Sequence, residues 1–147
     1  MNRKIEKIII STLIIVVVGA LSFPWVLYLI GLANMEGRPA LTENNRISET
    51  EINALWNEFR ENGPVHIERL NPCYYALFFV GPMTRKPASG ERLVGYIASD
   101  YNSHHLKNRR ILYWHLSCAA LTVWLTRNWT TDQLLSKAQE IRKNWMK

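Results

Sequence analysis

Apolar residues fill the N-terminal part of this chain without interruption before the pattern becomes mixed. Residues 8–33 (IIISTLIIVVVGALSFPWVLYLIGLA) contain no charged side chain. As a helix with a rise of about 1.5 Å per residue, this segment reaches about 39 Å, more than the roughly 30 Å hydrocarbon core of a bilayer. The pattern therefore predicts a transmembrane helix, with Trp25 and Tyr28 at its far interface.

A cleaved signal peptide is the alternative interpretation of this segment, with cleavage near Ser22. The apolar region of a signal peptide usually runs only about 7–15 residues, so the length favours a retained membrane anchor. Residues 1–7 are rich in Lys and Arg, and the next positive charge after the span is Arg38. Because Lys and Arg accumulate on the cytoplasmic side, these flanks predict a cytoplasmic N-terminus and a domain on the other side, which is the periplasm for a bacterial inner membrane.

Beyond the span, apolar residues recur at helical spacing between polar turns. Residues 34–47 are polar, contain Gly37 and Pro39, and are predicted to form a linker. The remaining residues, 48–147, are long enough for one small domain with a single core. The chain is thus predicted to consist of a basic flank, a transmembrane helix, a linker and one helical domain.

The first helix of the domain is predicted to begin after Ser48. Glu51 lies three residues later, and this pair has the spacing of a capping box, in which each side chain bonds the backbone N–H of the other residue. Gly63-Pro64 is predicted to end the helix. The apolar stripe between these signals consists of Ile52, Leu55, Trp56 and Phe59.

Later stripes predict a helix over about 93–102 and a longer one from about 108 to 128. Thr130 and Gln133 form a second capping-box pattern, which opens a last amphipathic helix toward the C-terminus. The apolar segment CYYALFFV (73–80) fits a buried helix, a buried strand or an element that dips into the membrane, with core packing favoured. The predicted fold class is mainly α.

The net charge of +6 favours anionic partners. Next to a bilayer, a mild positive excess favours lipid headgroups or an acidic protein, and it is too weak to predict nucleic-acid binding. Cys73 and Cys118 fit either a disulfide in an oxidising compartment or two buried thiols, and both interpretations stay open. No motif predicts a metal site or a cofactor.

Two candidate sites emerge from the charged residues. Lys107, Arg109 and Arg110, with Arg85-Lys86 across the domain, have the chemistry to hold a phosphate or pyrophosphate, although a solvated basic face is the simpler interpretation. Glu58 lies beside the aromatic stripe of the first helix, where partial burial would favour general acid–base chemistry. A helix-surface glutamate is the simpler interpretation there.

The run RRILYWHLSCAALTVWLTRNWTTDQLL (109–135) resembles a segment of the peptidoglycan glycosyltransferases, glycosyltransferase family 51. In that family a helix with an R-K-x-x-E motif leads into A-x-x-L-E, a short turn, and S-K-D-E-I-L at the start of the next helix. Ala119-Ala120-Leu121, the Thr130 cap and Leu134-Leu135 keep this rhythm. The resemblance implies a lysozyme-like helical domain that acts on lipid II at the outer face of the inner membrane, assisted by a divalent cation.

The resemblance further implies that Glu58 is the counterpart of the family's general base and that Lys107, Arg109 and Arg110 contact pyrophosphate. The chain departs from the family at its other motifs. The motif E-D-x-x-F-x-x-H-x-G appears only as EFRENGPVH, G-x-S-T-I-T-Q-Q is absent from GERLVGYIAS, and the glutamate of R-K-x-x-E falls near Ser117.

These departures predict a degenerate relative that binds a lipid-linked envelope precursor or an envelope protein with little or no catalysis. Two alternatives remain. The first is an active peptidoglycan glycosyltransferase that uses Glu58. The second is an interaction subunit or inhibitor in a membrane complex, for which the many tryptophans would provide a partner surface.

Overall fold

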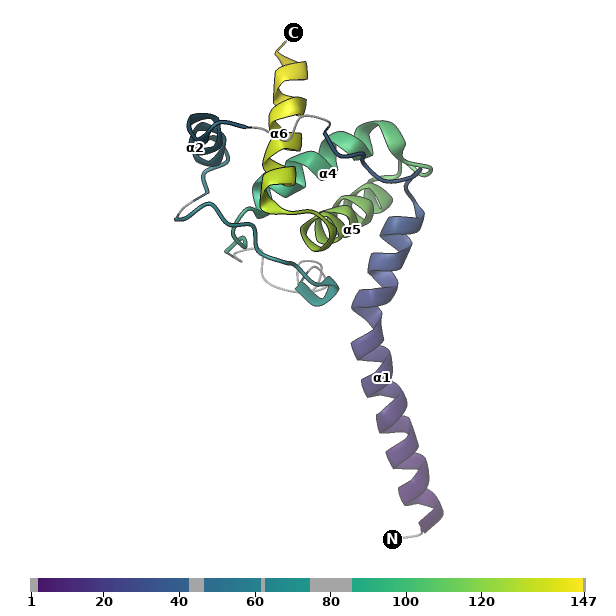
Figure 1. Ribbon diagram of the computed structural model, residues 1–147. Helices are drawn as coiled ribbons and strands as arrows, with labels where there is room; N and C mark the ends of the chain where they lie inside the picture. Colours follow the sequence, from purple (N-terminus) through teal and green to yellow (C-terminus); the bar gives the residue numbers. More distant parts are fainter. Residues whose placement is uncertain (1–2, 43–46, 62, 75–85, 147) are drawn as a thin grey trace.

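The computed structural model describes residues 3–42, 47–61, 63–74 and 86–146, and this part of the chain is mainly helical, as predicted (Figure 1). No strand occurs among these residues, and an isolated antiparallel bridge joins Met35 to Leu106. The helices are α1 (Arg3–Ala33), α2 (Glu49–Glu58), α4 (Glu91–His105), α5 (Ile111–Asn128) and α6 (Thr131–Trp145).

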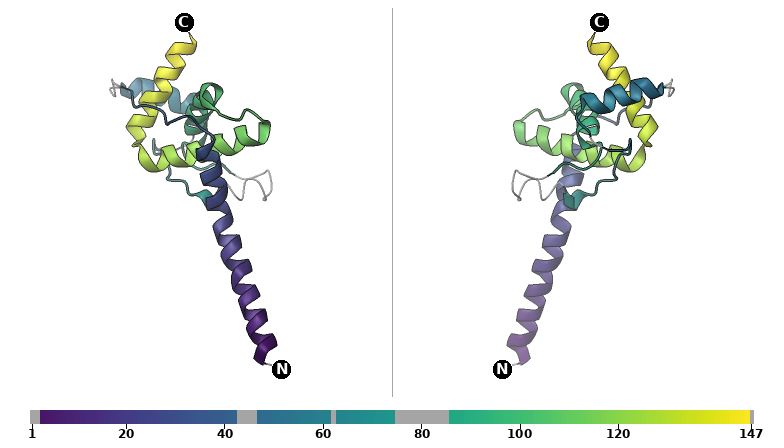
Figure 2. Two further views of the ribbon diagram at one scale, coloured as in Figure 1. Left: turned by 90° about the vertical axis from the view of Figure 1, so that its right-hand side faces the viewer. Right: turned by 90° about the vertical axis from the view of Figure 1, so that its left-hand side faces the viewer.

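Helix α1 extends away from the other helices as a long rod (Figures 1 and 2). Its segment Lys7–Ala33 is long and apolar enough, by length and composition, to cross a membrane. Only 6% of its most apolar window is buried against the rest of the chain. This exposure distinguishes α1 from a core helix of a water-soluble protein, whose apolar face is covered by its neighbours.

The last turns of α1 pack on α5, which runs across them (Figure 2). Gly31 lies at the crossing, where a Cβ atom would be 2.4 Å from the backbone oxygen of Leu116 and 2.6 Å from the Cβ atom of Ala120. Both distances are shorter than any van der Waals contact, so only glycine fits here. The missing side chain allows the two helix backbones to approach closely.

Hydrogen bonds extend this contact beyond the end of α1. The Asn34 side chain donates to Ser117 Oγ at 3.0 Å and accepts from the Asn108 backbone N–H at 3.0 Å. Asn34 and Met35 are 8% and 3% exposed, and Met35 belongs to the main core. Residues 34–42, which the polarity pattern predicted to be part of a linker, therefore begin inside the fold of the domain.

The main core lies between α4, α5 and α6, and α2 covers one side of α6. This core consists mainly of leucine and isoleucine side chains, and their removal from water is the main source of stability in a domain of this size. The most deeply buried large apolar residues are Leu55, Leu93, Ile97, Leu121, Leu125, Leu134 and Leu135.

Helix α2 begins as predicted and ends earlier than predicted. Both arms of the capping box between Ser48 and Glu51 are present. The helix stops at Glu58 because Arg60 adopts a left-handed conformation (φ 53°), and Arg60 and Glu61 donate backbone bonds to the last turn. The Arg92 guanidinium donates to the Arg60 carbonyl at 3.0 Å, so the backbone just beyond the helix end is bonded to α4 as well.

The remaining helices follow the predicted order with shifted ends. Helix α4 is longer at both ends than the helix predicted over 93–102. Helix α5 begins at Ile111 because the residues before it are held in another conformation. The Asn108 N–H donates to the Asn34 side chain, and the Asn108 side chain accepts from the Arg110 N–H. The capping box of Thr130 and Gln133 opens α6 as predicted. Most of the apolar segment 73–80 lies outside the described residues, so its predicted packing is not tested.

Gly31→Leu is expected to destabilise the fold, whereas Gly19→Leu is a matched control because a Cβ atom there meets nothing within 4 Å. Forcing a side chain between α1 and α5 is expected to cost about 1–3 kcal/mol. Thermal unfolding of the full-length protein in detergent, followed by tryptophan fluorescence, measures the difference. Equal melting temperatures for the two variants would contradict the close crossing.

Glu51 connects α2 to α6 and is the basis of a pH prediction. Its carboxylate accepts from the Ser48 backbone at 3.1 Å, from Gln139 at 3.2 Å and from Lys143 at 3.1 Å. The bonds from Ser48, then those from Lys143 and Gln139, lower the pKa of Glu51 to about 2. Because the folded-state pKa lies below the ordinary value of 4.5, the carboxylate stabilises the fold fully above about pH 4.5 and loses this effect as the pH falls through about 2.

Glu51→Gln should therefore lose less thermal stability than the wild type between pH 7 and pH 2, since the glutamine keeps a cap but has no charge to titrate. Glu49→Gln, which removes the other acid of the first turn, is the control and should follow the wild type. Melting temperatures recorded across this pH range provide the comparison. A Glu51→Gln curve parallel to the wild type would rule out the proposed titration.

Candidate functional site

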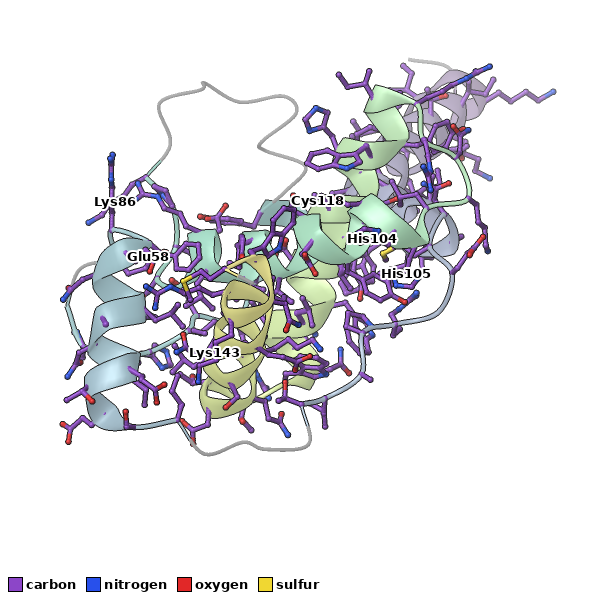
Figure 3. All side chains as sticks on the ribbon, turned by 90° about the horizontal axis from the view of Figure 1, so that it is seen from above. Glu58, Lys86, His104, His105, Cys118 and Lys143 are labelled. Carbon is purple, nitrogen blue, oxygen red and sulfur yellow. The ribbon has the colours of Figure 1, made fainter. Side chains whose placement is uncertain are left out.

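Glu58, the predicted general base, lies at the C-terminal end of α2 on the surface of the domain (Figure 3). Its Oε2 atom is 3.0 Å from Nε of Arg142, and the two side chains are 48% and 33% exposed. Glu58 is thus a helix-surface glutamate, the simpler of the two interpretations of the sequence, and its carboxylate turns toward Arg142 on α6. An exposed ion pair of this kind contributes little to stability.

Lys107, Arg109 and Arg110 lie in the connection between α4 and α5, next to the end of α1. Lys107 Nζ donates to the Ala33 carbonyl at 2.9 Å and so satisfies a terminal carbonyl of α1. Arg109 and Arg110 are exposed. This connection and Glu58 are on opposite sides of the domain (Figures 1 and 3), so the structure does not bring the two predicted sites together.

The other predicted phosphate contacts do not join this cluster. Lys86 lies on the α2 side of the domain, where it lines a hollow of about 370 Å³ with Glu61 and Arg92. Arg85 lies outside the described residues. His104 and His105 are both exposed in the last turn of α4, and the His105 ring stacks on Tyr101 with centroids 4.2 Å apart.

The two cysteines are free thiols in the structure. Cys73 is exposed, whereas Cys118 lies between α4 and α5 with its Sγ atom 3.9 Å from the Gly95 carbonyl. Burial raises the pKa of the Cys118 thiol to about 11. The structure differs from both interpretations of the sequence, which were a disulfide and two buried thiols. The two thiols are unpaired, but Cys118 alone lies between helices and Cys73 lies at the surface.

A basic pocket at the junction of α5 and α6, here called the junction pocket, was not found by sequence reasoning. It has a volume of about 450 Å³ and brings together Arg69, Arg127 and His66 with several threonine side chains. No carboxylate occurs among the described residues that line it. The full lining is His66, Ile67, Arg69, Thr126, Arg127, Asn128, Trp129, Thr130, Thr131 and Leu134.

The junction pocket is built where an extended segment crosses the end of α5. The Leu70 backbone N–H donates to Thr126 Oγ1 at 3.2 Å, and an Arg127 guanidinium nitrogen lies 3.4 Å from the Leu70 carbonyl. These bonds hold Arg69, the neighbour of Leu70, beside Arg127. Helix α6 begins at the same place, so the positive end of its dipole adds to the two guanidinium charges.

The junction pocket is also close to α1. Leu70 and Val123 form a small buried cluster against which Tyr28 of α1 packs. Residues on the wall of the pocket are thus one contact away from the last two turns of the apolar helix. The α5–α6 turn lies on the side of the domain from which α1 extends (Figure 1).

The chemistry of the junction pocket is that of anion binding. Guanidinium groups, hydroxyl groups and a helix N-terminus are the donors that hold phosphate in proteins. No periodic pattern or motif in the sequence connects residues 66–70 to residues 126–131, and only the tertiary fold brings them together. Neither arginine stands in a basic run, since Glu68 and Leu70 flank Arg69 and Thr126 and Asn128 flank Arg127, so no local signal in the sequence indicated the pocket.

Thiol labelling should distinguish the two cysteines. At a pKa of about 11, roughly one Cys118 thiol in a thousand is ionised at pH 8, and its position between two helices also restricts access. Cys73 is therefore expected to react with a maleimide at least ten-fold faster than Cys118 in the folded protein. Mass spectrometry of peptides from a labelling time course measures both rates, and equal rates would contradict the burial of Cys118.

Comparison with known proteins adds no relative to this picture. No family model, no curated protein and no solved structure matches the chain. The function is therefore inferred from the apolar helix, the junction pocket and their relative positions.

Proposed function

We propose that this protein is a single-pass membrane protein whose domain binds the phosphate-bearing headgroup of a lipid in the junction pocket. A lipid-linked envelope precursor such as lipid II is the proposed ligand class. The observation that carries the proposal is the position of a pocket with two arginines and no lining carboxylate beside the end of α1. At this place, lipid headgroups are the anions present at the highest local concentration.

The length of α1 supports this placement. The 27 residues of Lys7–Ala33 correspond to about 40 Å of helix, roughly 10 Å more than the hydrocarbon core. With Lys7 at the inner boundary, about the last seven residues, from Leu27 onward, extend into the outer headgroup layer. Tyr28, which packs against the small cluster of Leu70 and Val123 next to the junction pocket, is then at headgroup depth.

The exposure of α1 supports a retained anchor over a cleaved signal peptide. Cleavage near Ser22 would leave a stub from Phe23 to Ala33 attached to the domain. Large apolar side chains of that stub are open to solvent in the isolated chain, for example Phe23 at 51% and Leu29 at 60%. In a bilayer, the same side chains face lipid at no cost.

The proposal also includes the orientation of the protein in the membrane and a family relationship. The basic N-terminal flank supports a cytoplasmic N-terminus and a domain on the periplasmic side of a bacterial inner membrane. The α5–turn–α6 arrangement, with Thr130 as the cap of α6, supports a relationship to the lysozyme-like peptidoglycan glycosyltransferases. Lys107, Arg109 and Arg110 provide a second basic surface near the end of α1.

The proposed role is binding, and no reaction is assigned to Glu58. Its ion pair with Arg142 is on the opposite side of the domain from the end of α1. The divalent cation that the family resemblance implies does not fit either. Among the described residues, no three His, Cys, Asp or Glu side chains converge to hold a metal ion, and the lining of the junction pocket offers no carboxylate ligand.

Native mass spectrometry of the full-length protein in detergent tests the proposal by counting bound lipid. Lipid II is compared with phosphatidylglycerol and with phosphatidylcholine at low and high salt. Removing one charge-assisted bond to a phosphate typically costs about 1.5–3 kcal/mol, or roughly ten-fold or more in affinity. Arg69→Gln and Arg127→Gln are therefore each expected to reduce lipid II adducts at least ten-fold.

Lys86→Gln is the matched control, because it removes a positive charge on the α2 side of the domain, outside both basic surfaces near α1. Arg109→Gln/Arg110→Gln tests the second basic surface separately. Arg69→Gln alone carries the test if Arg127→Gln unfolds the chain through the loss of its contact with Leu70. Loss of adducts only in Arg109→Gln/Arg110→Gln would move the site to the α4–α5 connection. The absence of selective adducts in the wild type, with a protein co-purifying in equal amount, would replace the lipid by a protein partner.

A further inference from the structure

The first turn of α5 exposes two large aliphatic side chains that nothing in the described part of the chain covers. Ile111 is 78% exposed and Leu112 is 59% exposed, and the next exposed position along this face of the helix is His115. In a water-soluble domain, two adjacent aliphatic residues with this exposure are unfavourable. Both residues belong to the first turn of α5, and the N-terminal part of this helix extends beyond α1 (Figure 2).

The position of this turn relative to α1 is rigidly determined. Gly31 is in contact with Leu116, five residues after Ile111, and Lys107 bonds the carbonyl of Ala33 on the other side of the turn. The Asn34 side chain donates to the Asn108 carbonyl at 3.1 Å and accepts from the Asn108 backbone N–H at 3.0 Å. The beginning of α5 therefore has a defined height along the axis of α1.

That height is the height of the outer headgroups. The same length argument that places Leu27–Ala33 beyond the hydrocarbon core places Gly31, and with it α5, at the membrane surface. Because α5 runs across α1, its first turn stays near this level where it extends past the apolar helix (Figure 2). Ile111 and Leu112 are thus within reach of the boundary between headgroups and acyl chains.

The charges next to this pair match an anionic lipid surface. Arg109 and Arg110 immediately precede Ile111, are exposed, and make no side-chain contact that the structure describes. Helix α5 also has no side-chain cap and no acidic residue in its first turn, in contrast to the capping boxes of α2 and α6. Arginine side chains and free backbone N–H groups both bind phosphate oxygens.

We propose that Arg109, Arg110, Ile111 and Leu112 form a second membrane contact, which we call the α5 hook, and that its partner is the anionic phospholipid leaflet through which α1 passes. Ile111 and Leu112 insert between the headgroups, and the two arginines bind lipid phosphates. With α1 as the first contact, the α5 hook prevents the domain from rotating about the membrane normal relative to its own lipids. This inference rests on the membrane span of the proposed function and does not depend on the junction pocket.

Site-specific fluorescence in nanodiscs tests the α5 hook. The background is the full-length Cys73→Ser variant, in which Cys118 is the remaining thiol and is buried. An environment-sensitive nitrobenzoxadiazole dye is attached at Ile111→Cys or, as a control on α2, at Asn53→Cys. The nanodiscs contain phosphatidylcholine with or without phosphatidylglycerol, and a lipid with a spin label near the headgroup serves as the quencher.

The dye at position 111 is expected to be quenched at least three-fold more than the dye at position 53, with blue-shifted emission. Arg109→Gln/Arg110→Gln should reduce this quenching in anionic nanodiscs and have a smaller effect in neutral ones, because the arginines bind negatively charged headgroups. Arg69→Gln, in the junction pocket, should leave it unchanged. Equal quenching at the two positions would overturn the α5 hook, even if the lipid adducts at the junction pocket are observed.

Discussion

The contact between Gly31 and α5 determines where every other surface of this protein lies. The absence of a side chain at Gly31 lets the backbone of α5 rest on α1, and the hydrogen bonds of Asn34 and Lys107 secure the chain on the other side of the crossing. An apolar helix connected by a flexible linker would leave the domain free to present any face to a membrane. Here the domain and the helix share one core, to which Leu32 and Met35 contribute.

The contact between α1 and α5 places two basic surfaces at a similar position along the axis of α1. The junction pocket is connected to α1 through Tyr28, and the α4–α5 connection through Ala33 and Asn34. Both positions lie within the last turns of the apolar helix, although they come from different parts of the sequence. Both basic surfaces are therefore near the end of α1, while Glu58 and its ion pair with Arg142 lie on the opposite side of the domain.

The structural features that the sequence predicted correctly are those that depend on local patterns. The apolar helix follows from composition, and the starts of α2 and α6 follow from capping boxes whose bonds span three residues. The end of α2 was misplaced because Arg60 adopts a left-handed conformation that glycine usually supplies, and Arg92 from α4 supports it. The junction pocket was not predictable, since Arg69 and Arg127 line one pocket only because the Thr126 and Arg127 side chains bond the Leu70 backbone and so join distant segments.

The shared core of α1 and the domain has a mechanical consequence. A helix whose apolar length exceeds the thickness of the bilayer reduces the mismatch by tilting, and it tilts more in a thinner bilayer. Because Gly31 and Asn34 allow no hinge between the two parts, the domain must lean by the same angle as the helix. In the proposed transmembrane arrangement, one edge of the domain then approaches the lipid while the other rises, so the thickness of the bilayer would set how the protein presents its surfaces.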